Sequence, residues 1–272
     1  MRQQQMVARL ERRRRVLHAG RVLAVGGVFF AFNRSQPAVG EPGPSPTPVG
    51  SAVVQGHTYV NELVSAPDLP NSVSPQTIVP LLDGRALVVA ADGDGRTAFV
   101  YDPATSASVD VMPVGMAMHA GHSAVRLRDG RVLVVTGGQS AWLFDPTTMR
   151  WASGDAVGRM VAARSGPAIA LLRDGRVLIA GGMPPGGTPG VDPALRSAEL
   201  FDPETLTFSP TGSIGTPTGG GPMVTLPDGR VYMAADPTAE VYDPSTGTFS
   251  AASTSSGGGG NPVALPDGRV VV

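Results

Sequence analysis

The chain has 272 residues, a formal net charge of −1 and no cysteine, so disulfides, thiolate metal sites and cysteine nucleophiles are excluded. Residues 1–34 hold eight arginines and one glutamate (+7), whereas residues 35–272 hold thirteen arginines and 21 acidic residues (−8). This larger part lacks the basic surface that nucleic-acid binding needs, so we expect no nucleic-acid partner.

The N-terminal segment, residues 1–34, combines the basic stretch RLERRRRVLHAGR with the apolar stretch VLAVGGVFFAF at 22–32. A basic region before an apolar core is typical of an export signal, but a span of the bilayer needs about 20 apolar residues. The segment is therefore either an export signal or an uncleaved signal-anchor, and a disordered basic tail is the alternative. We expect the rest of the chain outside the cytoplasm, anchored to the membrane or secreted. Residues 35–51 are rich in proline and predict an extended linker.

The remaining residues, 52–272, are repetitive. An Asp-Gly-Arg triplet occurs five times, beginning at Asp83, Asp129, Asp174, Asp228 and Asp267. An aromatic residue followed by Asp-Pro occurs four times, with its aspartate at Asp102, Asp145, Asp202 and Asp243. A period in the forties with several short strands per unit indicates a β-propeller. We place the repeats near 75–115, 116–160, 161–213, 214–255 and 256–272.

Each full repeat predicts four strands. Asp-Gly suits a two-residue type I′ hairpin, in which both central residues have positive φ. The apolar, β-branched stretch after it predicts a buried second strand, and the Gly-Gly pairs at 137–138 and 181–182 end that strand. The Asp-Pro pair ends the third strand. The repeated arginines are expected to pair with acidic residues, since a repeated position serves the repeat.

These motifs resemble the kelch-repeat family, within the galactose-oxidase-like superfamily. The third repeat carries the likeness best, in ARSGPAIALLRDGRVLIAGG followed by SAELFDPETLTF. The resemblance implies an all-β kelch-type propeller of four full repeats and a half repeat. The chain is then either a truncated larger propeller or five blades closed by N-terminal strands from residues 52–65. Repeats 1 and 4 lack the glycine pair, and Ser108 replaces an aromatic residue.

One cluster of candidate metal ligands stands out: His119, His122, Met116 and Met118. Histidine and methionine together suit a soft metal ion. His122 also occupies a position where kelch repeats often have histidine, and methionine fills irregular gaps in cores. We favour the structural interpretation and predict no metal, no cofactor and no catalytic residue.

The third repeat contains an insertion of about a dozen residues in MPPGGTPGVDPALR, residues 183–196. Loops between second and third strands gather on one face of a propeller, so Pro184, Pro185, Asp192 and Arg196 are the candidate partner-binding residues. The alternative is a tolerated surface insertion. We predict a non-catalytic scaffold that binds a protein or carbohydrate partner. The competing hypothesis is a fragment of a galactose-oxidase-like copper oxidoreductase whose site lies in missing blades. The resemblance implies a Cys–Tyr crosslink for that activity, and this chain has no cysteine.

Overall fold

The computed structural model describes residues 52–54, 57–59, 74–92, 95–113, 116, 121–187, 192–235, 238–252 and 261–271. The predicted signal or anchor segment and the linker lie outside these residues. The chain divides into two units, and the first contains only one described sheet, in which β1 (Ala52–Val54) pairs antiparallel with β2 (His57–Tyr59). Closure of a fifth blade by residues 52–65 stays a prediction. No helix within the described ranges is long and apolar enough to cross a membrane.

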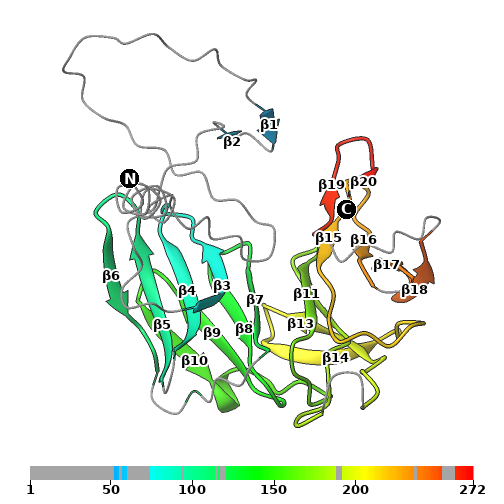
Figure 1. Cartoon of the computed structure of the whole chain (residues 1–272), viewed down its shortest axis with the longest axis horizontal. Helices are drawn as coiled ribbons and strands as arrows, with labels where there is room; N and C mark the ends of the chain where they lie inside the picture. Colours follow the sequence, from blue (N-terminus) through cyan, green and yellow to red (C-terminus); the bar gives the residue numbers. More distant parts are fainter. Residues whose placement is uncertain are drawn as a thin grey trace, which may run out of the picture. The chain divides into compact units, whose positions relative to one another are not determined.

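The second unit contains four antiparallel sheets of four strands each and one of two strands, in line with the predicted repeats (Figure 1). Repeat 1 consists of β3 (Ser74–Pro80), β4 (Ala86–Asp92), β5 (Gly95–Asp102) and β6 (Ala107–Asp110). Repeat 2 consists of β7 (Ser123–Arg126), β8 (Val132–Val135), β9 (Ala141–Asp145) and β10 (Arg150–Ser153), followed by a 3-10 turn at Gly154–Ala156. Repeat 3 consists of β11 (Ala168–Leu171), β12 (Val177–Ala180), β13 (Ala198–Asp202) and β14 (Thr207–Thr211). Repeat 4 consists of β15 (Met223–Thr225), β16 (Val231–Met233), β17 (Glu240–Asp243) and β18 (Thr248–Ala251). The fifth sheet pairs β19 (Val263–Ala264) with β20 (Val270–Val271).

The strands of each sheet follow one another in sequence order, and the first strand of each sheet lies beside the first strand of the next. This arrangement of successive antiparallel sheets is that of a β-propeller. The structure therefore confirms the predicted all-β class with one four-stranded sheet per full repeat.

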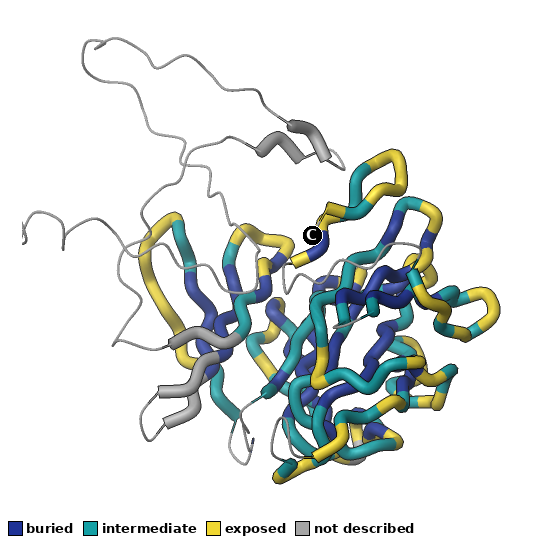
Figure 2. The backbone as a smooth tube through the Cα atoms, turned by 45° about the vertical axis from the view of Figure 1, so that its right-hand side comes forward, coloured by how far each residue is buried: buried dark blue, intermediate teal, exposed yellow. Residues whose placement is uncertain are grey.

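The second strand of each full sheet is buried on both faces, which explains its continuous apolar sequence. Val132 and Val134 of β8 belong to the hydrophobic core shared with repeat 1. Leu133 and Val135, which alternate with them, belong to the core shared with repeat 3. The outer strands β6, β14 and β18 are largely exposed, and Figure 2 shows the buried residues concentrated inside the sheets.

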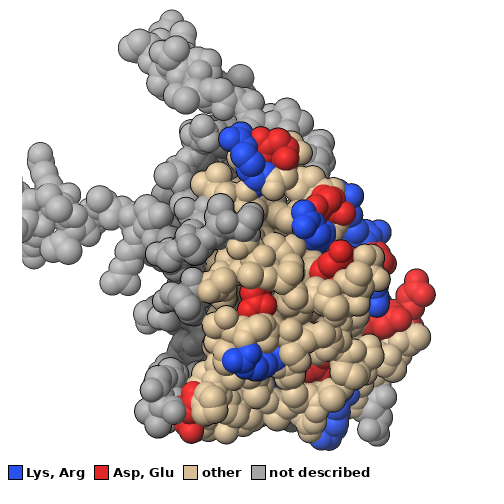
Figure 3. All heavy atoms as spheres, turned by 90° about the vertical axis from the view of Figure 1, so that its right-hand side faces the viewer, with Lys and Arg blue, Asp and Glu red and all other residues tan. Residues whose placement is uncertain are grey.

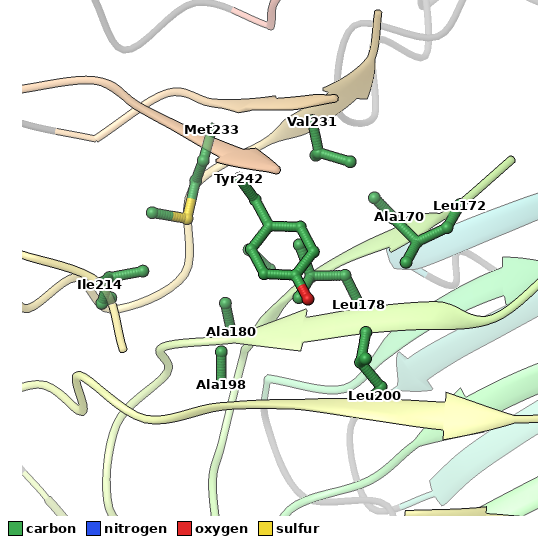
Figure 4. Packing of buried hydrophobic residues seen from close by; sticks show 11 residues of the cluster. Ala170, Leu172, Leu178, Ala180, Ala198, Leu200, Ile214, Val231, Met233 and Tyr242 are labelled. Atoms are coloured by element: carbon green, nitrogen blue, oxygen red, sulfur yellow. The ribbon is translucent and has the colours of Figure 1, made fainter. Parts of the chain in front are cut away.

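The core between repeats 3 and 4 shows how neighbouring sheets interlock. The ring of Tyr242, from β17, points toward Leu178 of β12 in the neighbouring sheet (Figure 4). Its hydroxyl lies 2.8 Å from the hydroxyl of Thr211 at the end of β14. The apolar face of each sheet is thus buried by side chains from the next sheet.

The Asp-Gly hairpins differ from the prediction. In repeat 2 the Gly130 N–H donates to the Leu127 carbonyl (3.2 Å), and the Leu127 N–H donates to the Arg131 carbonyl (2.8 Å). This pattern encloses three residues, 128–130, and only the glycine has positive φ, at 92°. The turn is a three-residue loop with glycine in the left-handed region, because the extra residue lets the aspartate keep an ordinary conformation. The predicted type I′ turn is wrong.

The Asp-Pro hairpins form as predicted. Asp145 Oδ1 accepts a hydrogen bond from the Thr147 N–H at 2.8 Å, and the other three aspartates accept one from the residue two positions on. Four residues after each aspartate the chain enters the left-handed region, at Ser106, Met149, Leu206 and Gly247. Three of these four positions carry a side chain that this conformation disfavours.

Candidate binding site at the loop end of repeats 3 and 4

Each four-stranded sheet has two ends. We call the end that carries the Asp-Gly and Asp-Pro hairpins the turn end. The opposite end, which carries the connections between second and third strands and the links from one sheet to the next, is the loop end. The candidate residues at 183–196 belong to the loop end.

The turn end is built as scaffold. In all five Asp-Gly-Arg triplets the arginine forms an ion pair with the aspartate of the same turn, at 2.6–2.7 Å. The hydrogen bond from Arg85 is the main cause of a pKa of Asp83 below its usual value. The arginines also tie repeats together, since Arg85 donates to the Pro146 carbonyl in repeat 2 at 3.0 Å. The repeated arginines are thus paired, as predicted.

A surface hollow of about 730 Å³ lies at the turn end between repeats 2 and 3. Its charged lining consists of three arginines and four acidic residues: Arg128, Arg131, Arg176, Asp129, Asp174, Asp202 and Glu204. Arg131 and Arg176 are each paired with the aspartate of their own turn. Red and blue side chains also lie directly beside one another on the face seen in Figure 3. The hollow therefore has no dominant charge to select a ligand, and we place the candidate site at the loop end.

The base of the repeat 3 loop is fixed by backbone hydrogen bonds. Met183 and Ser165 exchange two of them, each 2.8 Å long, and the Leu195 N–H donates to the Gly182 carbonyl at 2.8 Å. Pro184 and Pro185 begin a turn that the Gly187 N–H closes on the Pro184 carbonyl at 2.9 Å, with Gly186 at φ 76°. This is a type II turn, in which proline and then glycine occupy the two central positions. The loop is therefore anchored at both strand ends.

The predicted contact residues lie differently within this loop. Pro185, Asp192 and Arg196 are exposed, and Pro184 is half-buried. Arg196 also contacts the next repeat, because its guanidinium donates to the Gly215 carbonyl. Its own carbonyl accepts a hydrogen bond from the Ile214 N–H at 2.9 Å. The structure thus joins the candidate loop to the link that leads into repeat 4.

A buried ion pair at the loop end of repeat 3 was missed by the sequence reasoning. Arg164 and Glu199 form it at 2.7 Å, and each side chain is 1% exposed. Arg164 also donates to the carbonyls of Gly181 (2.7 Å) and Ser197 (2.9 Å). Glu199 Oε2 accepts from the Val161 N–H at 2.6 Å. A buried charge pair requires such additional hydrogen bonds to offset desolvation.

Repeat 4 has a related carboxylate with a different surrounding. Glu240 is 3% exposed, and its two oxygens accept hydrogen bonds from the N–H groups of Gly215 and Thr216, each at 2.8 Å. Within the ranges that the structure describes, Glu240 forms no ion pair with a basic side chain. The signal for both glutamates was available in the sequence, since a charged residue interrupts the apolar third strand in SAELFD and TAEVYD.

The candidate metal ligands are not assembled by the residues that the structure describes. His119 and Met118 lie outside them, and Met116 is buried in the apolar core between repeats 1 and 2. His122 is buried, and its Nε2 has no hydrogen-bond partner within the described part of the chain. Burial lowers the pKa of His122, and a hydrogen bond to the Val89 carbonyl acts in the opposite direction.

Comparison with known proteins supports the fold. No family model and no curated protein sequence matches this chain. A solved structure, described as a novel fungal alcohol oxidase with catalytic diversity among the AA5 family, in complex with copper, is similar with a TM-score of 0.53 and 15% identity. The likeness covers 68% of this chain and 45% of that structure, so this chain spans less than half of its length. The sheets and this likeness together define the fold class as an all-β fold of β-propeller type.

The residues that the structure describes do not assemble a copper centre of their own. The described residues contain no group of three or more histidine, aspartate or glutamate side chains that could hold a metal ion, and the sequence has no cysteine. We therefore derive no reaction that uses copper.

Proposed function

We propose that this chain is a kelch-type β-propeller that binds a protein or carbohydrate partner through its loop end and does not catalyse a reaction. The observation that carries the proposal is the anchored repeat 3 loop. It holds Pro185, Asp192 and Arg196 in exposed positions on a base fixed by the Ser165–Met183 hydrogen bonds. Exposed polar and proline residues on loops above a rigid sheet are the usual means by which a scaffold binds partners.

Two features of the sequence support the kelch assignment and the location. The Asp-Gly-Arg and aromatic-Asp-Pro motifs recur in register through four repeats. The basic and apolar segment at 1–34, followed by a proline-rich linker, suits a propeller held outside the cytoplasm by a signal-anchor, or secreted. A reporter enzyme that is active only outside the cytoplasm, fused after residue 272, tests this location. Reporter activity that is the same with and without residues 1–34 would contradict it.

The binding role is tested by shortening the repeat 3 loop. Replacement of residues 183–196 by Gly-Gln leaves the five residues Gly-Gly-Gly-Gln-Ser between β12 and β13, which matches the length of the Thr-Gly-Gly-Gln-Ser connection of repeat 2 at 136–140. The full-length chain and this variant are compared on an array of glycans and peptides, with Glu204→Ala at the turn end as the control. We expect the variant to fold and to lose affinity by about tenfold or more, while the control binds normally. Equal binding by the loop variant would show that the loop is a tolerated insertion.

A further inference from the structure

Repeats 3 and 4 hold a buried glutamate with the same arrangement of backbone donors, but they place different side chains around it. The equivalence is set by hydrogen bonds. Glu199 accepts from the N–H groups of residues 161 and 162, and Glu240 accepts from those of residues 215 and 216. Three positions after the first of these donors stand Arg164 in repeat 3 and Thr218 in repeat 4.

Strand register also makes Arg164 and Thr218 equivalent, because each lies seven residues before the residue, Leu171 or Thr225, that pairs with the first residue of the second strand. The Arg164 carbonyl accepts from the Gly138 N–H of the preceding repeat at 3.1 Å. The Thr218 carbonyl accepts from the Gly182 N–H of its preceding repeat at 3.0 Å. The two donors lie in the connections that follow β8 and β12, at the third residue after Val135 and the second residue after Ala180, so each carbonyl meets the same part of the preceding repeat. Threonine therefore replaces arginine at one position of a conserved geometry within the chain.

The acceptors around the Arg164 guanidinium have counterparts in repeat 4. In repeat 3 they are the carbonyls of Gly181 and Ser197, the Ser197 hydroxyl and Glu199. By strand register the corresponding positions in repeat 4 are Ala235, Thr238 and Glu240, since Ile179 pairs with Glu199 and Met233 pairs with Glu240. Position 238 again carries a hydroxyl. We call these three residues with Thr218 the repeat 4 slot.

The repeat 4 slot differs from its counterpart in charge and access. Glu240 is buried with two backbone donors, and within the described ranges no basic side chain forms an ion pair with it. Arg196 lies at the rim of the slot, where its guanidinium donates a hydrogen bond to the Gly215 carbonyl rather than to Glu240. Thr218, Ala235 and Thr238 are half-buried and Gly215 is exposed, so the slot borders solvent, whereas Arg164 is fully buried. A carboxylate that is buried from water and held by two backbone N–H groups attracts a cation strongly.

We propose that the repeat 4 slot binds the guanidinium of an arginine side chain supplied by a protein partner. Its oxygen acceptors correspond to those that hold Arg164, and a planar guanidinium with five donors matches such a set better than an ammonium does. The inference rests on the proposed binding function of the loop end and deepens it, because it selects a protein over a carbohydrate and names the group that the protein presents.

The test uses the full chain with ethylguanidinium as the probe and measures binding by calorimetry and by the shift in melting temperature. Sodium chloride at the same ionic strength is the reference. We expect saturable binding by the wild type and a rise in Kd of about tenfold or more in Glu240→Gln, because removing the charge removes most of the attraction. Glu204→Gln, an exposed glutamate of repeat 3, is the matched control and keeps the wild-type Kd.

Two exchanges between the repeats complete the test. Thr218→Arg places a guanidinium in the slot, so it should abolish probe binding and raise the melting temperature. Arg164→Thr should lower the melting temperature and respond to the probe with a larger upward shift than the wild type. If Arg164→Thr fails to fold, Thr218→Arg and Glu240→Gln decide the matter. Absence of wild-type binding, or an unchanged Kd in Glu240→Gln or Thr218→Arg, overturns the proposal.

The outcome is separable from that of the proposed function. The variant with the shortened repeat 3 loop loses Arg196 at the rim but keeps the acceptors of the repeat 4 slot itself, so it should still bind ethylguanidinium. Probe binding without any loop-dependent partner would support the slot and reject the loop. If a partner binds in a loop-dependent manner but ethylguanidinium does not bind, the loop proposal is supported and the slot proposal is rejected.

Discussion

Arg131 extends from the Asp-Gly hairpin of repeat 2 to the backbone carbonyl of Pro203 in repeat 3, at 3.1 Å. The same guanidinium is paired with Asp129 in its own turn at 2.6 Å. One side chain thus closes a hairpin and fastens it to the next sheet. The contact gives a motif that looks chemically active a structural role, since Arg85 and Arg131 each fasten their own turn to the next sheet.

The contact between Arg131 and Pro203 predicts that removal of the repeated arginine lowers stability by different amounts in different repeats. Arg131→Ala should lower the free energy of unfolding by about 1 kcal/mol, since the pair is partly exposed and its hydrogen bonds are screened by water. Arg269→Ala, which removes the same pair at a side chain that is 77% exposed, should change it by less than about 0.5 kcal/mol. Urea unfolding of both variants measures the difference. Equal losses would mean that the contact to Pro203 contributes nothing.

The close approach of backbones at Gly220 predicts a severe substitution. A Cβ there would lie 1.8 Å from the Gly166 carbonyl oxygen, whereas a Cβ at Gly84 would meet no atom within 4 Å. Both glycines have positive φ, at 96° and 88°, so they share the conformational strain. We expect Gly84→Ala to cost roughly 1 kcal/mol and Gly220→Ala roughly 3 to 5 kcal/mol, as strain and overpacking add. Thermal unfolding distinguishes them, and similar melting temperatures would contradict the close packing.

The left-handed residue of the Asp-Pro hairpins offers a stabilising change. Ser106 is exposed with φ 59°, and repeat 4 has Gly247 at the same position with φ 69°. Ser106→Gly should raise the free energy of unfolding by about 0.5 to 1 kcal/mol, because relief of the left-handed strain exceeds the entropy cost of glycine. Gly247→Ser is the reverse exchange and should lower it. Chemical denaturation of the pair provides the measurement, and the same sign for both would refute the explanation.

The buried imidazole of His122 predicts acid sensitivity. Its pKa lies below 6.5 in the folded chain because burial disfavours the charged form. The unfolded chain therefore binds more protons as pH falls below about 6.5, and the stability that is fully present above that pH is lost progressively below it. His122→Leu should flatten the slope of unfolding free energy against pH between about 5 and 7. Identical slopes for the two proteins would show that His122 does not contribute.

The repeats could be predicted from the sequence because their signals are local. The Asp-Gly-Arg turn, the apolar second strand and the Asp-Pro turn each lie within a few residues of chain. The hairpin type was predicted wrongly, because Asp-Gly fits both a two-residue and a three-residue loop. The choice depends on the register of the flanking strands, which the pair Leu127 and Arg131 fixes through hydrogen bonds.

The buried charges of the loop end could not be predicted in the same way. Arg164 and Glu199 are 35 residues apart, and only the packing of a link segment against a third strand brings them together. Glu199 and Glu240 were visible as breaks in apolar strands, but the difference between their surroundings depends on Arg164 and Thr218. That difference becomes apparent only when the repeats are aligned by their hydrogen bonds rather than by their motifs.

The burial of β12 on both faces sets a rule for how this protein can change in length. Loss of one residue within the strand would turn every side chain after it toward the wrong neighbour. Loss of the 45 residues 129–173 would leave each remaining strand in phase with a neighbour of the same kind. Duplication or deletion of a whole repeat should therefore disturb the packing of the sheets less than deletion of one residue within a strand.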